Sequence, residues 1–400
     1  MSRKTKTKAG MGFAVATIFV DAIGIGLIFP IMPDLLADLG INSVADAALY
    51  GAALSTVYAV MQFLFLPILG NLSDQLGRRP VLLIGIAALF VDYIIMGVAA
   101  NYALLFIGRL VAGVAGATVA TATSYIADVS PPDDRAQNFG VIGATFGIGF
   151  IIGPALGGLL GAIDIRFPFF AAAGFAGLNF AYGLFFLPES LLPEKRRAFT
   201  WQRANPFKAL KRAATDPALR RPVFVVFCMM LAGYVYPAVW SFYGKEKFGW
   251  DTALIGFSLA GYGVAVAIVQ GVLIRFMLPK WGERGTVRFG LVSVIIAMVG
   301  ITFAVDTWMV FSMITMAALG EVAGPAINGI LSKLVSDSEQ GDLQGTLGSI
   351  ESLAAIIAPP VFSSIFNAFS DGEGLYFPGA PFLLAALITG FALLIFRRTP

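Results

Sequence analysis

Long runs of apolar residues, separated by short polar stretches, recur along the whole chain. Each run is about 20 residues long, the length that an α-helix needs to cross a hydrocarbon core of about 30 Å. The period-2 alternation of a membrane β-barrel is absent from the sequence, so the runs predict helices. The predicted spans are 11–37, 47–72, 80–99, 102–126, 137–161, 167–187, 220–243, 252–277, 286–304, 307–334, 343–368 and 378–396. We therefore expect an all-α integral membrane protein with twelve transmembrane helices.

The longest polar stretch lies within residues 188–219 and divides the twelve spans into two groups of six. It is rich in lysine and arginine, which is typical of a segment that lies on the anionic inner leaflet of a membrane. The predicted organisation is an N-terminal six-helix bundle over residues 1–187, a cytoplasmic basic linker over 188–219 and a C-terminal six-helix bundle over 220–400.

The two halves of the chain repeat at a constant offset of 205 residues. At this offset Gly77-Arg78-Arg79 falls on Gly282-Glu283-Arg284, Gly140 falls on Gly345, and Pro154 falls on Pro359. One offset that joins three separate places is hard to obtain by chance. The repeat predicts two pseudo-equivalent bundles that are related by an axis along the membrane normal.

The distribution of lysine and arginine predicts the orientation, because these residues accumulate on cytoplasmic loops. If the N-terminus is inside, most of the basic loops face the cytoplasm and only Arg166, Lys245 and Lys247 face outward. We expect a multi-pass protein of the cell inner (plasma) membrane with both termini cytoplasmic. The net charge of +3 comes from these loops, so it indicates no nucleic-acid partner. We expect a monomer.

The composition limits which side chains can bind a metal, form a disulfide or transfer a proton. The chain is 58% hydrophobic and 13% charged, which leaves too little polar surface for a soluble protein. It has no histidine and one cysteine, Cys228, so we expect no histidine-based metal site, no intrachain disulfide and no bound cofactor. Any proton chemistry must therefore fall to carboxylates.

The turn after the second span combines glycines with charges. Gly70 and Gly77 allow close helix approach and a tight turn, and Asp74 can lie against the positive N-terminus of another helix. Arg78 or Arg79 can reach Asp128 at the end of the fourth span. This cluster would close the inner side of a transporter and break when that side opens. We predict a gate formed by Gly70, Asp74, Gly77, Arg78, Arg79 and Asp128.

The fifth span carries a run of glycines between Gly149 and Gly158, with Gly153-Pro154 at its centre. Glycines stacked on one helix face permit close packing, and a proline inside a helix frees a carbonyl and kinks the helix. Gly153 and Pro154 are therefore further gating candidates. Generic close packing of membrane helices remains the alternative interpretation.

Charges inside membrane spans are costly, so each is a functional candidate. Helix rise places Asp92 and Arg109 at similar depth on consecutive antiparallel spans, and Asp21 lies near the midplane, so Arg109 can serve either carboxylate. Glu321 and Glu351 fall at similar depth in the other half. The candidates for proton coupling are Asp21, Asp92, Arg109, Glu321 and Glu351. The two glutamates can equally line a substrate cavity without transferring a proton.

Aromatic and amide side chains at positions that can face the interior suit a pocket for a flat, amphipathic molecule. The substrate-binding candidates are Tyr58, Gln62, Phe146, Tyr234, Tyr236, Trp240, Gln270, Asn328 and Gln344. Each can also serve as a helix contact or as a residue of the interfacial aromatic belt.

The motifs also resemble a known family. The turn at 70–79 is similar to the major facilitator superfamily signature G-x-L-x-D-x-x-G-R-[KR], and residues 149–158 resemble its antiporter signature G-x-x-x-G-P-x-x-G-G. Other stretches resemble the tetracycline/proton antiporters of the drug/proton antiporter group. These are Asp21 with Pro30 and Pro33, Met61-Gln62 through Arg79-Pro80, Asp92-Tyr93, Gly108-Arg109-Leu110 through Gly116-Ala117-Thr118, and Gly324-Pro325-Ala326 through Gly341-Asp342-Leu343-Gln344-Gly345.

The resemblance implies the major facilitator fold, with Asp21, Asp92 and Arg109 at positions important for transport. It also implies a drug exported in exchange for protons, with tetracycline carried as a divalent-metal chelate. The chain departs from the family pattern in two ways. An aspartate of the ninth span is missing near Val294, and Glu321 and Glu351 stand where the family is uncharged.

We therefore predict a proton-coupled secondary active transporter that exports an amphipathic small molecule or drug, tetracycline-like, by alternating access. Protonation of Asp21, alone or together with Asp92, would release Arg109 and favour one orientation. A major facilitator importer, symporter or uniporter of a small metabolite is the alternative. We expect no enzyme, because the sequence has no catalytic constellation, and the missing G-x4-G-K-[ST] motif disfavours ATP drive.

Overall fold

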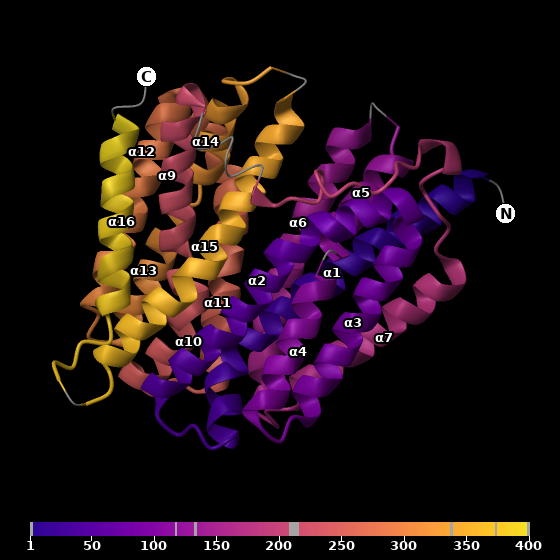
Figure 1. Cartoon of the computed structure of the whole chain (residues 1–400). Coiled ribbons are helices and arrows are strands. Elements are labelled where there is room, and N and C mark those ends of the chain that lie inside the picture. Colours follow the sequence, from indigo (N-terminus) through magenta and orange to yellow (C-terminus); the bar gives the residue numbers. More distant parts are fainter. Residues whose placement is uncertain are drawn as a thin grey trace. The chain divides into compact units, whose positions relative to one another are not determined.

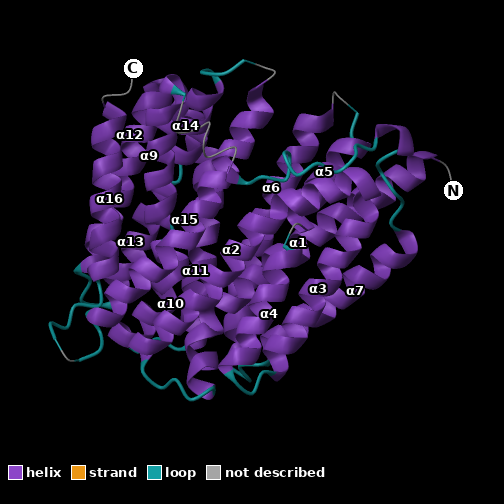
Figure 2. Ribbon diagram, in the orientation of Figure 1, coloured by secondary structure: helices purple, strands orange, loops and turns teal. Residues whose placement is uncertain are grey.

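The computed structural model describes residues 3–116, 118–131, 134–207, 216–336, 339–372 and 374–397. These residues form helices joined by turns and loops, and no strand occurs among them (Figure 1 and Figure 2). Ala117 of the family resemblance and Lys208, Lys211 and Arg212 of the predicted linker lie outside the described residues.

The first half contains α1 (Arg3–Asp38), α2 (Val44–Leu76), α3 (Arg78–Val98), α4 (Tyr102–Ala115), α5 (Thr118–Val129), α6 (Arg135–Gly161) and α7 (Phe167–Phe186). A short 3-10 helix, η2, covers Pro193–Lys195. The second half contains α9 (Pro217–Gly233), α10 (Val235–Phe248), α11 (Thr252–Ile268), the π-helix η3 (Val269–Leu273), α12 (Ile274–Thr302), α13 (Thr307–Gly320), α14 (Ala323–Ser332), α15 (Gln340–Ala368) and α16 (Ala380–Arg397).

Eleven helical stretches in the described part are long and apolar enough to cross a membrane. One of them, Thr252–Thr302, is 51 residues long, and Gly282 interrupts it with a φ of 63° and a ψ of 175°. About 20 residues suffice for one crossing, so this stretch supplies the predicted spans 252–277 and 286–304. The prediction of an all-α protein with twelve transmembrane helices is confirmed.

The chain forms two compact units. Unit 1 comprises residues 1–35, 57–205 and 252–260, and unit 2 comprises residues 36–56, 206–251 and 261–400. In unit 1, α3 packs against α7 and α4, and α3 and α7 lie side by side in Figure 1. Because α3 is central to this packing, its charged residue Asp92 lies in the interior of unit 1.

In unit 2, α12 packs against α13 and α16, and α16 packs against α9. Helices α9, α12 and α16 lie side by side in Figure 1. They share a core with α14 and α15 that is formed by apolar side chains, among them Leu219, Leu291, Leu331, Leu343 and Phe396. Helix α15 packs against α9 and α10.

The 205-residue offset found in the sequence recurs in the helix boundaries. The turns before α3 and inside α12 are centred on Gly77 and Gly282, and both glycines have positive φ, of 111° and 63°. Only glycine adopts that backbone without strain. Helices α4 and α13 both begin after an N-cap, Asn101 or Asp306, whose side chain accepts a backbone N–H of the first turn. Corresponding positions of the two halves therefore have the same local structure.

The glycines of α6 pack against the backbone of α1. A Cβ added at Gly149 would lie 2.7 Å from the Ala22 Cβ, and one added at Gly153 would lie 2.7 Å from the Ile23 carbonyl oxygen. One at Gly157 would lie 2.5 Å from the Leu27 carbonyl oxygen. These three glycines, spaced one helical turn apart, let α6 lie directly on the segment of α1 that carries Asp21.

Candidate functional site

The turn between α2 and α3 is organised around Arg78. The Arg78 guanidinium donates to the Asp74 Oδ1 at 2.7 Å, to the Asp128 Oδ2 at 3.0 Å and to the Ser73 hydroxyl at 3.1 Å. Its side chain is 12% exposed, so these charge-assisted bonds are shielded from water. Arg79 instead donates to the Leu184 carbonyl, at 2.8 Å. Of the two arginines, Arg78 is therefore the one that links the ends of α2 and α5.

The corresponding turn of unit 2 carries the same kind of link with its charges exchanged. The Lys333 ammonium lies 2.7 Å from the Glu283 Oε1. Glu283 and Lys333 stand 205 positions after Arg78 and Asp128. In both units an ion pair therefore joins the start of one helix to the end of another, but the cation and the anion have changed places.

Sequence reasoning missed Glu189, which caps the N-terminus of α3. Its Oε1 accepts the Arg78 N–H at 2.8 Å and its Oε2 accepts the Arg79 N–H at 3.2 Å. A carboxylate satisfies the free N–H groups there and complements the helix dipole. A Cβ at Gly77 would lie 2.3 Å from the Glu189 Oε2, so only glycine leaves room for this cap.

The segment after Glu189 continues along the same turn. The Arg197 N–H donates to the Asp74 carbonyl oxygen at 3.1 Å, and the Asn71 side-chain amide donates to the Thr200 carbonyl oxygen at 2.7 Å. The Ser190 hydroxyl donates to the Asp128 Oδ2 at 3.1 Å. The described start of the predicted linker is thus tied to the gating candidates Asp74, Arg78 and Asp128. The one signal in the sequence was an acidic residue directly after an apolar span.

Asp21 lies in the interior of unit 1, 9% exposed. It lines a cavity of about 10 Å³ with Tyr93, Thr118, Asn179 and several apolar side chains. The Thr118 hydroxyl is buried and has no hydrogen-bond partner among the described residues, and the Asn179 amide donates to the Thr17 hydroxyl at 3.0 Å. A cavity this small excludes a drug-sized molecule, but its polar groups suit a carboxyl that gains and loses a proton.

The structure pairs Arg109 with Asp92 rather than with Asp21. The Arg109 Nη2 contacts the Asp92 Oδ2, and the Asp92 side chain is fully buried. Gly108 makes this contact possible, because a Cβ there would lie 2.9 Å from the other Asp92 oxygen. The Arg109 guanidinium also lies over the ring of Tyr58, 5.6 Å from its centroid. Asp92 is therefore compensated by an ion pair, whereas the described part of the chain gives Asp21 no basic partner.

Gln62 has a structural partner at the break between α4 and α5. Its amide donates to the Gly116 carbonyl oxygen at 3.2 Å and lies 3.5 Å from the Tyr58 hydroxyl. A helix break frees carbonyls that must find a donor within the protein. Tyr58 and Gln62 therefore join the Asp92–Arg109 region, and Phe146 stacks on Phe150, with ring centroids 6.3 Å apart.

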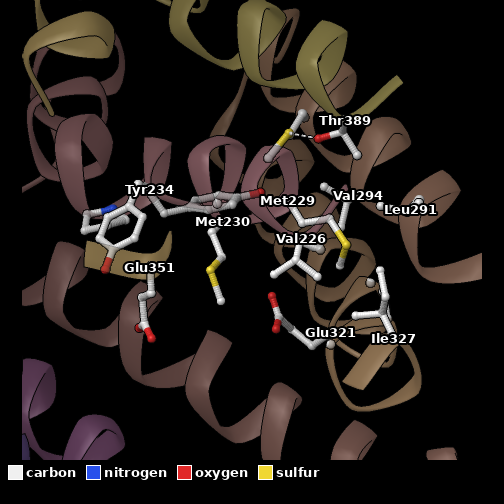
Figure 3. Close-up of a pocket in the computed structure, with 18 of the residues that line it drawn as sticks. Val226, Met229, Met230, Tyr234, Leu291, Val294, Glu321, Ile327, Glu351 and Thr389 are labelled. Atoms are coloured by element: carbon white, nitrogen blue, oxygen red, sulfur yellow. Dashed lines mark hydrogen bonds between the residues drawn. The ribbon is translucent and has the colours of Figure 1, made fainter. Parts of the chain in front are cut away.

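Unit 2 contains a cavity of about 370 Å³. Its lining combines methionine and tyrosine side chains with two carboxylates and one amide (Figure 3). The methionine and polar residues of the lining are Met229, Met230, Tyr234, Tyr236, Tyr262, Met298, Glu321, Asn328, Glu351 and Thr389. The volume falls in the range of small-molecule sites, about 300–1,000 Å³. Five predicted residues thus converge on one cavity: Tyr234, Tyr236, Asn328, Glu321 and Glu351.

Two helix breaks shape this cavity. Tyr234 stands between α9 and α10, and Glu321 stands between α13 and α14. The Glu321 carboxylate accepts a hydrogen bond from the Tyr262 hydroxyl at 2.8 Å. Discontinuous helices are tolerated within a membrane where the freed backbone is buried or lines a cavity. The breaks place Tyr234 and Glu321 at this cavity.

Trp240, Gln270 and Gln344 are not among the lining residues of the cavity. Trp240 is buried in an aromatic cluster with Tyr236, Trp250 and Phe382, at centroid distances of 5.7, 5.8 and 6.1 Å. Gln270 is exposed and lies in the π-helix η3. Within the described ranges no group of three or more histidine, cysteine or acidic residues is arranged to hold a metal ion.

The helical architecture, the internal repeat and the buried charges define a membrane transporter, and a comparison with known families agrees. The Major Facilitator Superfamily matches residues 14–359 and 245–400. The chain belongs to the Major Facilitator Superfamily. It is therefore a multi-pass membrane transporter of small molecules and not an enzyme.

Among curated relatives, the class C tetracycline resistance protein of Escherichia coli is 39% identical over 379 residues, covering 93% of this chain and 94% of its own. The class G tetracycline resistance protein of Vibrio anguillarum is 41% identical over 390 residues, covering 96% of each chain. Among solved structures, a bacterial homologue of the human lysosomal transporter Spinster aligns over 97% of this chain and 96% of its own. The TM-score is 0.78 at 14% identity, which shows a shared fold.

Proposed function

We propose that this protein exports an amphipathic drug of the tetracycline type from the cytoplasm in exchange for protons. The observation that carries the proposal is the buried carboxylate of Asp21. It lies in a membrane-spanning helix, beside hydroxyl and amide groups, and Arg109 is paired with Asp92 instead. Intramembrane carboxylates of this kind mark proton relays. The relatives, which are tetracycline resistance proteins, support a drug as the cargo.

In this proposal Asp21 takes up and releases the proton, and α3 transmits the change of charge from Asp21 to the Asp92–Arg109 pair. Tyr93 lines the Asp21 cavity and is adjacent in the chain to Asp92. A change of charge on Asp21 therefore acts on the helix that holds the Asp92–Arg109 pair. The glycines of α6 lie against the same segment of α1, which makes α1 and α6 a closely packed pair for this change.

The drug binds in the cavity of unit 2, and the ion pairs of Arg78 stabilise one of the conformations between which the transporter alternates. The protein acts in the bacterial inner membrane with both termini in the cytoplasm, as the basic loops indicate. It acts as a monomer, and its tetracycline-type cargo travels as a divalent-metal chelate.

The test is transport by the full chain in liposomes with an acidic interior. Tetracycline is supplied outside with and without Mg²⁺, and accumulation is measured before and after a protonophore is added. Proton antiport predicts accumulation that collapses with the gradient and is larger when Mg²⁺ is present. A symporter accumulates drug only when the outside is acidic, and a uniporter only equilibrates it. Either of these results would overturn the proposal.

The variant that isolates the mechanism is Asp21→Asn, with Asp134→Asn as a matched control because Asp134 is exposed at the start of α6. Asp21→Asn is expected to abolish gradient-driven accumulation and to retain exchange of labelled for unlabelled drug, which shows that the variant folds and binds. Asp134→Asn is expected to behave as the parent protein. Full gradient-driven accumulation by Asp21→Asn would remove this carboxyl from the mechanism.

A further inference from the structure

The lining of the unit 2 cavity contains two carboxyl groups and no basic residue. Glu321 comes from the break between α13 and α14, and Glu351 comes from α15. In Figure 3 the two carboxylates lie on either side of the Met230 side chain and point into the same cavity. Two carboxylates that line one cavity repel each other unless a proton or another positive charge lies between them.

The described part of the chain supplies no such positive charge. Glu321 accepts one hydrogen bond, from the neutral Tyr262 hydroxyl, and Glu351 has no ion pair or hydrogen bond to any described residue. In unit 1, by contrast, the buried Asp92 is matched by Arg109. A cavity lined by two carboxyl groups and by no basic residue attracts a positive charge, so unit 2 favours a ligand that brings a cation.

A second polar group in the cavity points to a ligand independently of the two carboxylates. The Tyr236 hydroxyl is buried and has no hydrogen-bond partner among the described residues. Its ring stacks on that of Tyr262, with centroids 5.9 Å apart, and both residues line the cavity. An unpaired buried hydroxyl costs free energy unless a bound molecule satisfies it.

The apolar part of the lining suits a flat organic body. Met229, Met230 and Met298 present flexible, polarizable side chains that adapt to different shapes. Tyrosine faces attract a cation within about 6 Å of the ring centroid, which adds to the attraction of the carboxylates. The cavity therefore offers polarizable surface, aromatic faces and negative charge together.

We propose that unit 2 binds a metal-free organic cation, with an aromatic or aliphatic body against the tyrosines and methionines and its positive charge between Glu321 and Glu351. This inference rests on the proposed function for the direction of transport, and it adds a second class of cargo, a metal-free cation, to the tetracycline chelate. It assigns substrate selection to Glu321 and Glu351, which are absent from the family pattern that the sequence resembles.

The experiment is equilibrium binding of tetraphenylphosphonium, a permanent cation that needs no metal, to the full chain in nanodiscs of zwitterionic lipid. Triphenylphosphine oxide, a neutral molecule with similar rings, is the matched ligand. We expect the cation to bind at least about tenfold more tightly than the neutral molecule. Each of Glu321→Gln and Glu351→Gln is expected to weaken cation binding about tenfold, and the double variant about a hundredfold.

Glu283→Gln is the matched control variant, because it removes a carboxylate that is paired with Lys333 and lies outside the cavity lining. It is expected to leave cation binding within about twofold of the parent. Equal binding of the cation and the neutral molecule to the parent protein would overturn the inference even if a glutamine variant failed to fold. Binding of the cation that is unchanged in the double variant would overturn it too, as would binding limited to a Mg²⁺–tetracycline chelate.

Failure of this inference can be told apart from failure of the proposed function, because binding is measured without a proton gradient. Gradient-driven tetracycline export without carboxylate-dependent cation binding would leave the function standing and overturn the charge assignment. Carboxylate-dependent cation binding without gradient-driven transport would support the site and overturn proton antiport.

Discussion

The two halves of the chain have the same local backbone structure at equivalent positions, but their interior charges have different partners. In unit 1 the buried Asp92 is paired with Arg109, and the carbonyl of Gly116 at the α4–α5 break accepts from Gln62. The repeat-equivalent of Gly116, 205 positions later, is Glu321, whose carboxylate lines the cavity of unit 2. At this helix break the freed carbonyl is therefore hydrogen-bonded to the Gln62 amide in unit 1. At the equivalent break of unit 2 the Glu321 carboxylate lines a cavity.

This difference indicates which features of a duplicated fold maintain its structure and which determine its function. The glycine turns at Gly77 and Gly282 and the N-caps at Asn101 and Asp306 preserve the helix boundaries in both halves. Side chains placed on that common scaffold then diverge. We interpret unit 1 as the half that holds the proton and unit 2 as the half that holds the drug.

The largest effect is expected from breaking the ion pair that distinguishes unit 1. Arg109→Met leaves Asp92 buried and charged without a partner, which should lower the free energy of unfolding by about 3–5 kcal/mol. Glu351→Gln, which removes an unpaired carboxylate, should change it by less than about 0.5 kcal/mol. Denaturant unfolding in detergent measures both values. Asp92→Asn combined with Arg109→Met should recover most of the loss, and equal stability of Arg109→Met and the parent would contradict the comparison.

A smaller effect is expected from the helix contact that supports Asp21. Gly153→Ala places a Cβ within 2.7 Å of the Ile23 carbonyl oxygen, so α6 and α1 must move apart at a cost of about 1–3 kcal/mol. The equivalent position of α15 is already alanine, the buried Ala358. Gly147→Ala is the control, since nothing lies within 4 Å of its added Cβ. Thermal unfolding of the two variants should differ, and identical midpoints would show that the contact is looser than described.

Exchanging the charges of the α2–α3 turn tests whether the Arg78–Asp128 ion pair of unit 1 can be replaced by the charge arrangement of the Glu283–Lys333 pair of unit 2. Arg78→Glu places a third carboxylate near Asp74 and Asp128, and should cost about 1–2 kcal/mol and most of the transport. Adding Asp128→Lys recreates the arrangement of Glu283 and Lys333. We expect partial recovery of transport, because the bonds from Arg78 to Asp74 and Ser73 are not restored. No recovery at all would show that the pairs of the two units are not equivalent.

The smallest effect is expected from the exposed pair of unit 2. Lys333 is 68% exposed, so its attraction to Glu283 is screened by water and salt. Glu283→Lys should change the free energy of unfolding by less than about 1 kcal/mol and transport by less than about twofold. Transport assayed at low and high salt measures the contribution of the Glu283–Lys333 ion pair to transport. A loss as large as that of Arg78→Glu would mean that the unit 2 pair is also a gate.

Much of the fold could be predicted from the sequence because span length and repeat offset are local properties. Charged residues inside apolar runs identified Asp21, Asp92 and Arg109, and span direction placed Arg78 near Asp128. Which carboxylate Arg109 contacts depends on how α1, α3 and α4 are rotated against one another, and Gly108 leaves room for Asp92. Helix rise gives depth along the membrane normal and carries no information on that rotation.

Other features depend on contacts between distant segments. Glu189 caps α3 from more than a hundred positions away, and no periodicity connects the two. Gln270 was a reasonable pocket candidate as an amide in an apolar span, but a π-helix there changes the face on which each side chain lies. Trp240 faces an aromatic cluster instead of the cavity. Residue type therefore predicted which side chains are functional candidates, but the rotation of each helix determines which of them contact one another.

The most direct test of the division of roles is proton release on drug binding, followed with a pH indicator in a weakly buffered detergent solution of the full chain. Mg²⁺–tetracycline should release protons from the parent protein. Asp21→Asn should bind the drug and release none, whereas Glu321→Gln combined with Glu351→Gln should bind more weakly and release the same number of protons per bound drug. Undiminished release from Asp21→Asn, or release lost only in the double glutamine variant, would contradict the account.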